Sequence, residues 1–161
     1  MTIRNISRLL AAAGMASGMA LGGLLSLTPV ALADDAQQIT LNAKDLSFTP
    51  TAVQLMVGQP VQLTVINGGM LDHDIKSDMP VGQLTYLQAD NDQQEQQDNA
   101  AQGVLDVDFN KGDTAQVSFV PTTAGTYSFE CDVPGHADAG MKGSFVVADN
   151  SSGADGGGAQ S

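Results

Sequence analysis

The stretch Tyr127–Val147, YSFECDVPGHADAGMKGSFVV, decides the fold and the chemistry expected of this chain. It holds the only cysteine of the protein, Cys131, with His136 five residues later and Met141 five residues after that. Thiolate, imidazole and thioether are the soft to borderline ligands that suit a copper ion changing between two oxidation states. The spacing Cys-x4-His-x4-Met therefore predicts three metal ligands on one loop between two strands.

A fourth ligand comes from an earlier part of the chain. His73 is the only other histidine, and it follows a turn-like Asn-Gly-Gly sequence at 67–69. Two histidines, one cysteine and a weakly bound methionine make the trigonal site of blue-copper electron-transfer centres. We therefore predict that His73, Cys131, His136 and Met141 bind one copper ion, and we assign no catalytic residue.

The same residues resemble the C-terminal ligand loop of the cupredoxins, the single-domain blue copper proteins. The spacing is most similar to that of auracyanin-like and rusticyanin-like members, whereas plastocyanin-like members usually have a shorter gap between cysteine and histidine. The likeness runs from about Gln38 to Ala148 and is strongest over Pro121–Val147. It implies a Greek-key β-sandwich. One departure is Asp74, where family members often carry asparagine or another small polar residue. The sequence therefore does not show which hydrogen bond this side chain makes beside His73.

Alternating apolar and polar residues predict short strands along the chain. Such alternation occurs at residues 39–43, 53–57, 61–65, 104–109, 115–119, 126–131 and 143–148. A further strand is expected to carry His73. Because side chains alternate between the faces of a strand, Tyr127, Phe129 and Cys131 should share the inward face. Seven to eight strands with turn signals between them predict an all-β, antiparallel β-sandwich.

Residues 82–103 break the alternating pattern. Leu84, Tyr86 and Leu87 suggest one turn of helix, and residues 90–99 then contain no apolar side chain. A segment without apolar residues has nothing to bury in a core. We expect a mobile, acidic, Gln-rich surface loop at about 88–103, and the sequence demands no helix of any length.

The N-terminal residues have the composition of an export signal. Arg4 and Arg8 precede a long uncharged run that ends in the A-x-A-like sequence Ala31-Leu32-Ala33. This pattern predicts a cleaved secretory signal, with an uncleaved membrane anchor as the alternative. The expected organisation is a signal peptide at 1–33, a cupredoxin domain at 34–149 and a disordered Ser/Gly-rich tail at 150–161.

The charge balance restricts the partners. Removing residues 1–33 takes away Arg4 and Arg8 and no acid, so the formal net charge falls from −12 to −14. This negative charge disfavours nucleic acid and anionic membrane surfaces as partners. It suits a redox protein with a basic docking patch, such as a c-type cytochrome, and solubility alone is the alternative explanation. We expect a monomer that is not embedded in a membrane and that works in the periplasm, or in the thylakoid lumen of a photosynthetic cell.

Counting ligands eliminates several other classes of protein. A zinc site would favour a harder or thiolate-rich fourth ligand over methionine. A binuclear copper centre needs a second cysteine, and the catalytic copper of an oxidase needs additional histidines. A cysteine hydrolase would leave Met141 without a role. The sequence thus predicts a non-enzymatic electron carrier, and it leaves open a copper carrier or scavenger that uses the same ligands.

Overall fold

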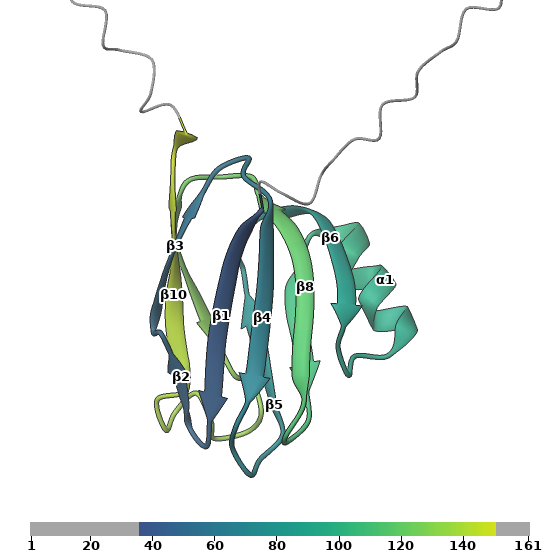
Figure 1. The fold of residues 1–161 in the computed structure, drawn as a ribbon, viewed down its shortest axis with the longest axis vertical. Helices are drawn as coiled ribbons and strands as arrows, with labels where there is room; N and C mark the ends of the chain where they lie inside the picture. The colour runs from purple at the N-terminus through teal and green to yellow at the C-terminus, as the bar shows by residue number, and fades with distance from the viewer. Residues whose placement is uncertain (1–35, 151–161) are drawn as a thin grey trace, which may run out of the picture. The chain divides into compact units, whose positions relative to one another are not determined.

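The computed structural model describes residues 36–150, so the predictions for the signal peptide and for the tail beyond residue 150 lie outside the described residues. Within this range, strands form two facing sheets and a single helix lies at one side (Figure 1). The elements are β1 Gln37–Lys44, β2 Ser47–Thr49, β3 Ala52–Met56, β4 Val61–Asn67, β5 His73–Ser77, β6 Val81–Gln88, α1 Gln93–Gln102, β7 Leu105–Phe109, β8 Thr114–Pro121, β9 Gly125–Glu130 and β10 Lys142–Ala148.

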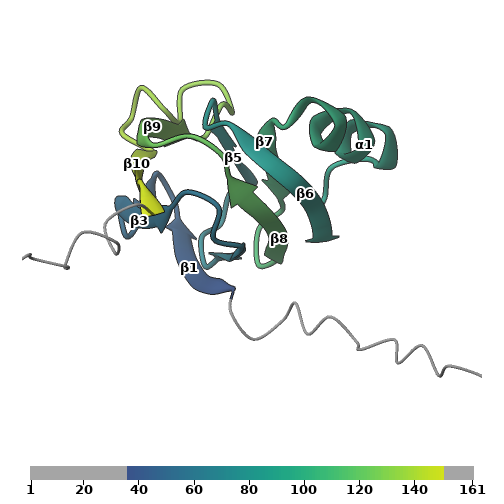
Figure 2. The same ribbon diagram turned by 90° about the horizontal axis from the view of Figure 1, so that it is seen from above.

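Each sheet has five strands. The first has the order β2-β1-β4-β8-β6 and the second has the order β3-β10-β9-β5-β7. The view from above shows the sheets as two layers (Figure 2). The space between them is filled by the inward side chains of both sheets, among them Phe48, Phe119, Phe129 and Phe145, each at most 1% exposed. The predicted all-β sandwich is therefore confirmed.

Two details of the predicted sandwich differ. The described residues contain ten strands rather than seven to eight, because β2 and β6 are added. The sheets are also mixed, since β1 pairs with β4 in parallel and β3 pairs with β10 in parallel. Alternation along a strand shows which face is buried, but it says nothing about the direction of the neighbouring strand. The chain crosses from the first sheet to the second after β2, and this crossing makes β3 a neighbour of the last strand.

The segment predicted as a loop contains the end of a strand and a helix, so the prediction of a loop is wrong, whereas its mobility stays a prediction. Leu84 and Tyr86 belong to strand β6, and α1 follows. The Asp92 side chain accepts a hydrogen bond from the Glu95 backbone N–H, and Gly103 ends the helix in the left-handed conformation at φ 67°. Caps of this kind satisfy the free backbone groups at both helix ends, so a helix forms without an apolar face. No residue of α1 is buried, which agrees with the expected surface position.

Helix α1 packs where the two sheets meet, beside the edge strands β6 and β7 (Figure 2). Asn99 donates from Nδ2 to the Tyr86 hydroxyl at 3.2 Å, and that hydroxyl donates to the Asp106 carbonyl at 2.6 Å. The Asn91 side chain accepts from the backbone N–H of Asp108 at 2.8 Å. These bonds satisfy part of an edge strand that would otherwise be open to pairing with another chain.

Candidate metal centre

The four predicted ligands come from one end of the second sheet. His73 opens β5, Cys131 follows β9, and Met141 directly precedes β10. Within the loop, the Cys131 N–H donates to the Met141 carbonyl at 3.1 Å, and the Met141 N–H donates to the His136 carbonyl at 3.0 Å. Gly135 turns the chain at φ 88°. The loop therefore folds back on itself, and it carries His136 and Met141 towards the cysteine.

Three of the ligand atoms form a compact triangle. Nδ1 of His73 lies 3.2 Å from Nδ1 of His136. The Cys131 Sγ lies 3.8 Å from the first nitrogen and 3.3 Å from the second. A point equidistant from three corners with these separations lies about 2 Å from each, which is close to the bond lengths of a zinc-sized ion to imidazole nitrogen and thiolate sulfur. The three side chains thus fit one first-row metal ion.

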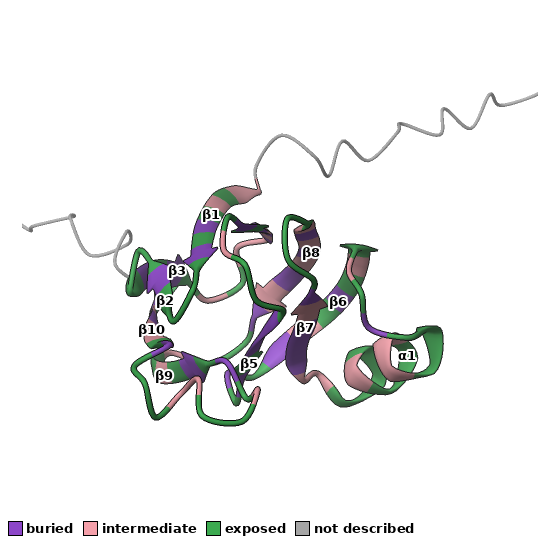
Figure 3. Ribbon diagram, turned by 90° about the horizontal axis from the view of Figure 1, so that it is seen from below, coloured by how far each residue is buried: buried purple, intermediate pink, exposed green. Residues whose placement is uncertain are grey.

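The site is buried on one side and lies close to solvent on the other. Cys131 and Met141 are 0% exposed and His73 is 3% exposed, whereas His136 is half-buried. The view from below shows mostly exposed residues along the loop that follows β9, with buried segments of β5 beside it (Figure 3). The ring of His136 is therefore the ligand that lies nearest to solvent.

Burial also sets the protonation of the ligands. Desolvation lowers the pKa of His73, and repulsion from His136 lowers it further, so the imidazole favours the neutral form that binds metals. Desolvation raises the pKa of the Cys131 thiol, although the backbone amides of Asp74 and Val133 oppose this by favouring the thiolate. A bound cation would supply the charge that stabilises the thiolate at this position.

The position of Met141 agrees with the predicted arrangement. Its side chain is fully buried, and its backbone forms hydrogen bonds with the backbones of both Cys131 and His136. Its role as a weak axial ligand stays a prediction, as does the binding of copper by each of His73, Cys131 and His136. The structure brings the last three together as one cluster of potential metal ligands, with their ligand atoms all within 4.8 Å of one another.

Sequence reasoning missed a group of acidic residues beside the site. A hollow of about 470 Å³ borders His73, and we call it the acidic hollow. Its acidic lining residues are Asp72, Asp74, Asp90, Glu95, Asp106, Asp108 and Asp132. They come from β5, β7, α1 and the connecting loops, so no short motif could have revealed them. Lys76 is the only lysine among the described residues that line the hollow.

Comparison with known proteins agrees with this geometry. A family model described as copper binding proteins of the plastocyanin/azurin family matches residues 36–148. The chain belongs to this family. The prediction of a cupredoxin is thereby confirmed, and the cluster of two histidines, one cysteine and the adjacent buried methionine suits a single copper ion.

Individual relatives are more distant. The copper-resistant cuproprotein CopI of Rubrivivax gelatinosus is 28% identical over 102 residues, which cover 63% of this chain and 60% of that relative. The chain thus spans less than two thirds of the relative's length. The dithionite-reduced auracyanin of Roseiflexus castenholzii is 20% identical with a TM-score of 0.52, covering 70% of this chain and 98% of the auracyanin.

Enzymes share the fold as well. A multi-copper oxidase of Pediococcus acidilactici superposes with a TM-score of 0.56 at 15% identity, covering 85% of this chain and 32% of the oxidase. At such low identities the likeness establishes the fold alone. The sandwich therefore does not separate electron carriers from oxidases, and the absence of a catalytic role stays a prediction.

Proposed function

We propose that this protein is an exported one-electron carrier with a single copper ion held by His73, Cys131, His136 and Met141. The observation that carries the proposal is the triangle of His73, His136 and Cys131, whose corners are anchored to strands or to a loop closed by backbone hydrogen bonds. Such a site changes little in shape when the charge of its ion changes. Small reorganisation is what fast electron transfer requires.

Each residue has a distinct part in this scheme. A bound copper ion would supply the one-electron change between Cu(I) and Cu(II). Cys131 would provide the thiolate, His73 would fix the site to the sandwich, and the buried Met141 would tune the potential weakly. Because His136 is the half-buried ligand, electrons would enter and leave at the surface around its ring.

Charge and location complete the proposal. The formal net charge of −12 for the whole chain, or −14 without residues 1–33, favours a redox partner with a basic patch. No helix in residues 36–150 has the length and apolar character needed to cross a membrane. We place the exported domain in the periplasm or a comparable compartment, with the N-terminal residues acting as its signal.

The decisive test is colour combined with electron exchange. The purified protein should bind one Cu(II) and show an intense visible band from charge transfer between the Cys131 sulfur and the metal. Cys131→Ser should keep the fold, as judged by circular dichroism, and lose the band. The wild type should exchange electrons rapidly with a small basic redox protein, and more slowly as salt rises. Preferential zinc binding without a visible Cu(II) band would refute the blue-copper site.

A second candidate is a copper carrier or scavenger. The observation that favours it is the 28% identity to a relative described as copper-resistant. A carrier of this kind would use the same ligands and would pass its copper on. Transfer of copper to a chelator within minutes, without electron exchange, would favour this second function. Retention of copper in both oxidation states would favour the first.

A further inference from the structure

The acidic hollow contains an ion triad made of Lys76, Asp106 and Asp132. The Lys76 Nζ lies 2.7 Å from Asp106 Oδ2 and 3.2 Å from Asp132 Oδ2. The Asp106 side chain is only 11% exposed, whereas the side chains of Lys76 and Asp132 are about half exposed. A buried carboxylate needs a close counter-charge. The ion pair of Lys76 with Asp106 should therefore be the stronger of the two.

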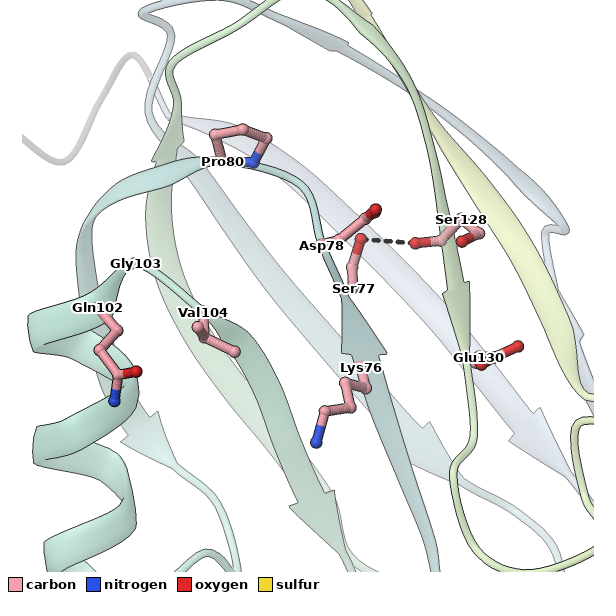
Figure 4. A pocket seen from close by; sticks show the side chains of 9 residues that line it. All are labelled: Lys76, Ser77, Asp78, Pro80, Gln102, Gly103, Val104, Ser128 and Glu130. Carbon is pink, nitrogen blue, oxygen red and sulfur yellow. Dashed lines mark hydrogen bonds between the residues drawn. The ribbon is translucent and has the colours of Figure 1, made fainter.

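Strand register explains how Lys76 comes to join these two acids. Lys76 lies opposite Asp106 on β7 and opposite Glu130 on β9. Figure 4 shows a second hollow, whose lining includes Lys76, Val104 and Glu130. In this view the lysine side chain extends towards β7 and away from the Glu130 side chain. The ammonium group therefore bridges the edge strand β7 and Asp132, the residue that immediately follows Cys131.

A second bond fixes Asp132 from its other side. The backbone N–H of Asp132 donates to Asp74 Oδ1 at 2.7 Å. Three carboxyl groups, those of Asp74, Asp106 and Asp132, thus gather near the cysteine, with one lysine between two of them. Without the lysine, the carboxylates of Asp106 and Asp132 would repel each other, and movement of Asp132 away from β7 would lower this electrostatic repulsion.

We propose that Lys76 is a positioning residue for the copper site, which holds Asp132 against β7 and thereby holds Cys131 in its place in the ligand triangle. The proposal depends on the metal cluster and not on the electron-transfer role. The competing explanation is that Lys76 acts only through its charge. Outer partners of metal ligands typically change metal affinity by about tenfold or more when they are replaced.

Two substitutions separate position from charge. Lys76→Gln makes the protein more negative and Asp106→Asn makes it less negative, yet both break the same ion pair. If Lys76 positions the loop, both variants should release copper to a chelator faster than the wild type, by about tenfold. If only the net charge of the protein matters, a more negative protein should hold the copper cation more tightly. Lys76→Gln should then release copper more slowly, and Asp106→Asn should release it faster. Opposite directions of this kind would overturn the proposal.

Matched controls complete the copper experiment. Lys76→Arg keeps the charge and the reach to both acids, so it should restore release close to the wild-type rate. Lys44→Gln removes the same charge from an exposed lysine on β1 that takes part in neither ion pair found in residues 36–150. It should leave release unchanged. Equal acceleration by Lys44→Gln and Lys76→Gln would mean that the effect does not come from the ion pairs of Lys76, and it would overturn the proposal.

A metal-free measurement tests the same idea independently of copper. Hydrogen exchange at the Asp132 amide, which is bonded to Asp74, should accelerate in both Lys76→Gln and Asp106→Asn. Thermal unfolding shows whether each variant is folded. If Asp106→Asn alone unfolds the protein, the double variant Lys76→Gln/Asp106→Asn takes its place. Unchanged exchange in folded Lys76→Gln would overturn the proposal. If the wild type bound no copper, this measurement would still decide the role of Lys76.

Discussion

Oδ1 of Asp74 accepts a hydrogen bond from the backbone N–H of Asp132, 2.7 Å away and 58 positions along the chain. Because Asp74 follows His73 and Asp132 follows Cys131, this bond joins the neighbours of two ligands, one at the start of β5 and one directly after β9. The separation between the imidazole and the thiol is therefore held by a direct link as well as by the loop. The bond also answers the question left by the aspartate at this position, since its carboxyl group serves as the acceptor.

Replacing Asp74 should affect the copper site according to the acceptor that remains. Asp74→Asn keeps an oxygen for the Asp132 N–H, so its copper release should stay close to the wild-type rate. Asp74→Ala leaves that N–H without its partner, and release to a chelator should be about tenfold faster. Stopped-flow absorbance of the visible band measures both rates. Equally fast release from Asp74→Asn would show that the charge, not the hydrogen bond, matters.

Met141 should tune the reduction potential without deciding whether copper binds. Met141→Leu keeps the volume and apolar character of this fully buried side chain and removes the thioether, so the potential should rise. Met141→Gln introduces a harder oxygen that favours Cu(II), so the potential should fall. Protein-film voltammetry measures both potentials. If neither substitution moves the potential beyond a small packing effect, Met141 only fills the core.

The end of α1 depends on a glycine that cannot be replaced freely. Gly103 has a φ of 67°, and a Cβ at this position would lie 2.5 Å from the Val81 carbonyl oxygen. Gly103→Ala should therefore destabilise the protein by about 2–4 kcal/mol. Gly112 is the matched control, because it has a φ of 81° with no neighbouring atom within 4 Å. Gly112→Ala should cost only about 1 kcal/mol.

Urea unfolding of both glycine variants measures the difference. Similar losses of stability in the two variants would show that the contact with Val81 is absent in solution.

Stability should depend on pH through Asp108 in the acidic hollow. Burial, with repulsion from Glu95, Asp106 and Asp132 that Lys76 only partly offsets, raises the pKa of Asp108 to about 6. The folded state then binds more protons than the unfolded state between about pH 4 and pH 6, so this contribution to stability is present at low pH and is lost as pH rises. Asp108→Asn should stabilise the copper-free protein at pH 7 by about 1 kcal/mol.

That gain should shrink as the pH falls towards 4, because the wild-type carboxyl group then becomes neutral in the folded state. Thermal unfolding at a series of pH values measures it. A gain that is independent of pH would contradict the raised pKa of Asp108.

Local sequence was sufficient for most of the strands and for the cluster of His73, Cys131 and His136. Alternation predicted that Phe129 of β9 and Cys131 directly after it face inward, and both side chains are fully buried. The spacing between Cys131 and Met141 indicated a ligand loop because few loops combine a thiolate, an imidazole and a thioether. The strand faces and the ligand loop depend on residues that are close together in the chain, whereas His73 was assigned to the site because it is the only other histidine.

Tertiary structure decided the features that depend on distant residues. The parallel pairings of β1 and β3 follow from the crossing between sheets. The place of α1 follows from Asn91 and Asn99, which form hydrogen bonds with neighbouring strands. The ion triad joins Lys76 to partners 30 and 56 positions away. Such pairings depend on strand register, which is set by the buried face of each strand together with the turns, and so they join residues that are far apart in the chain.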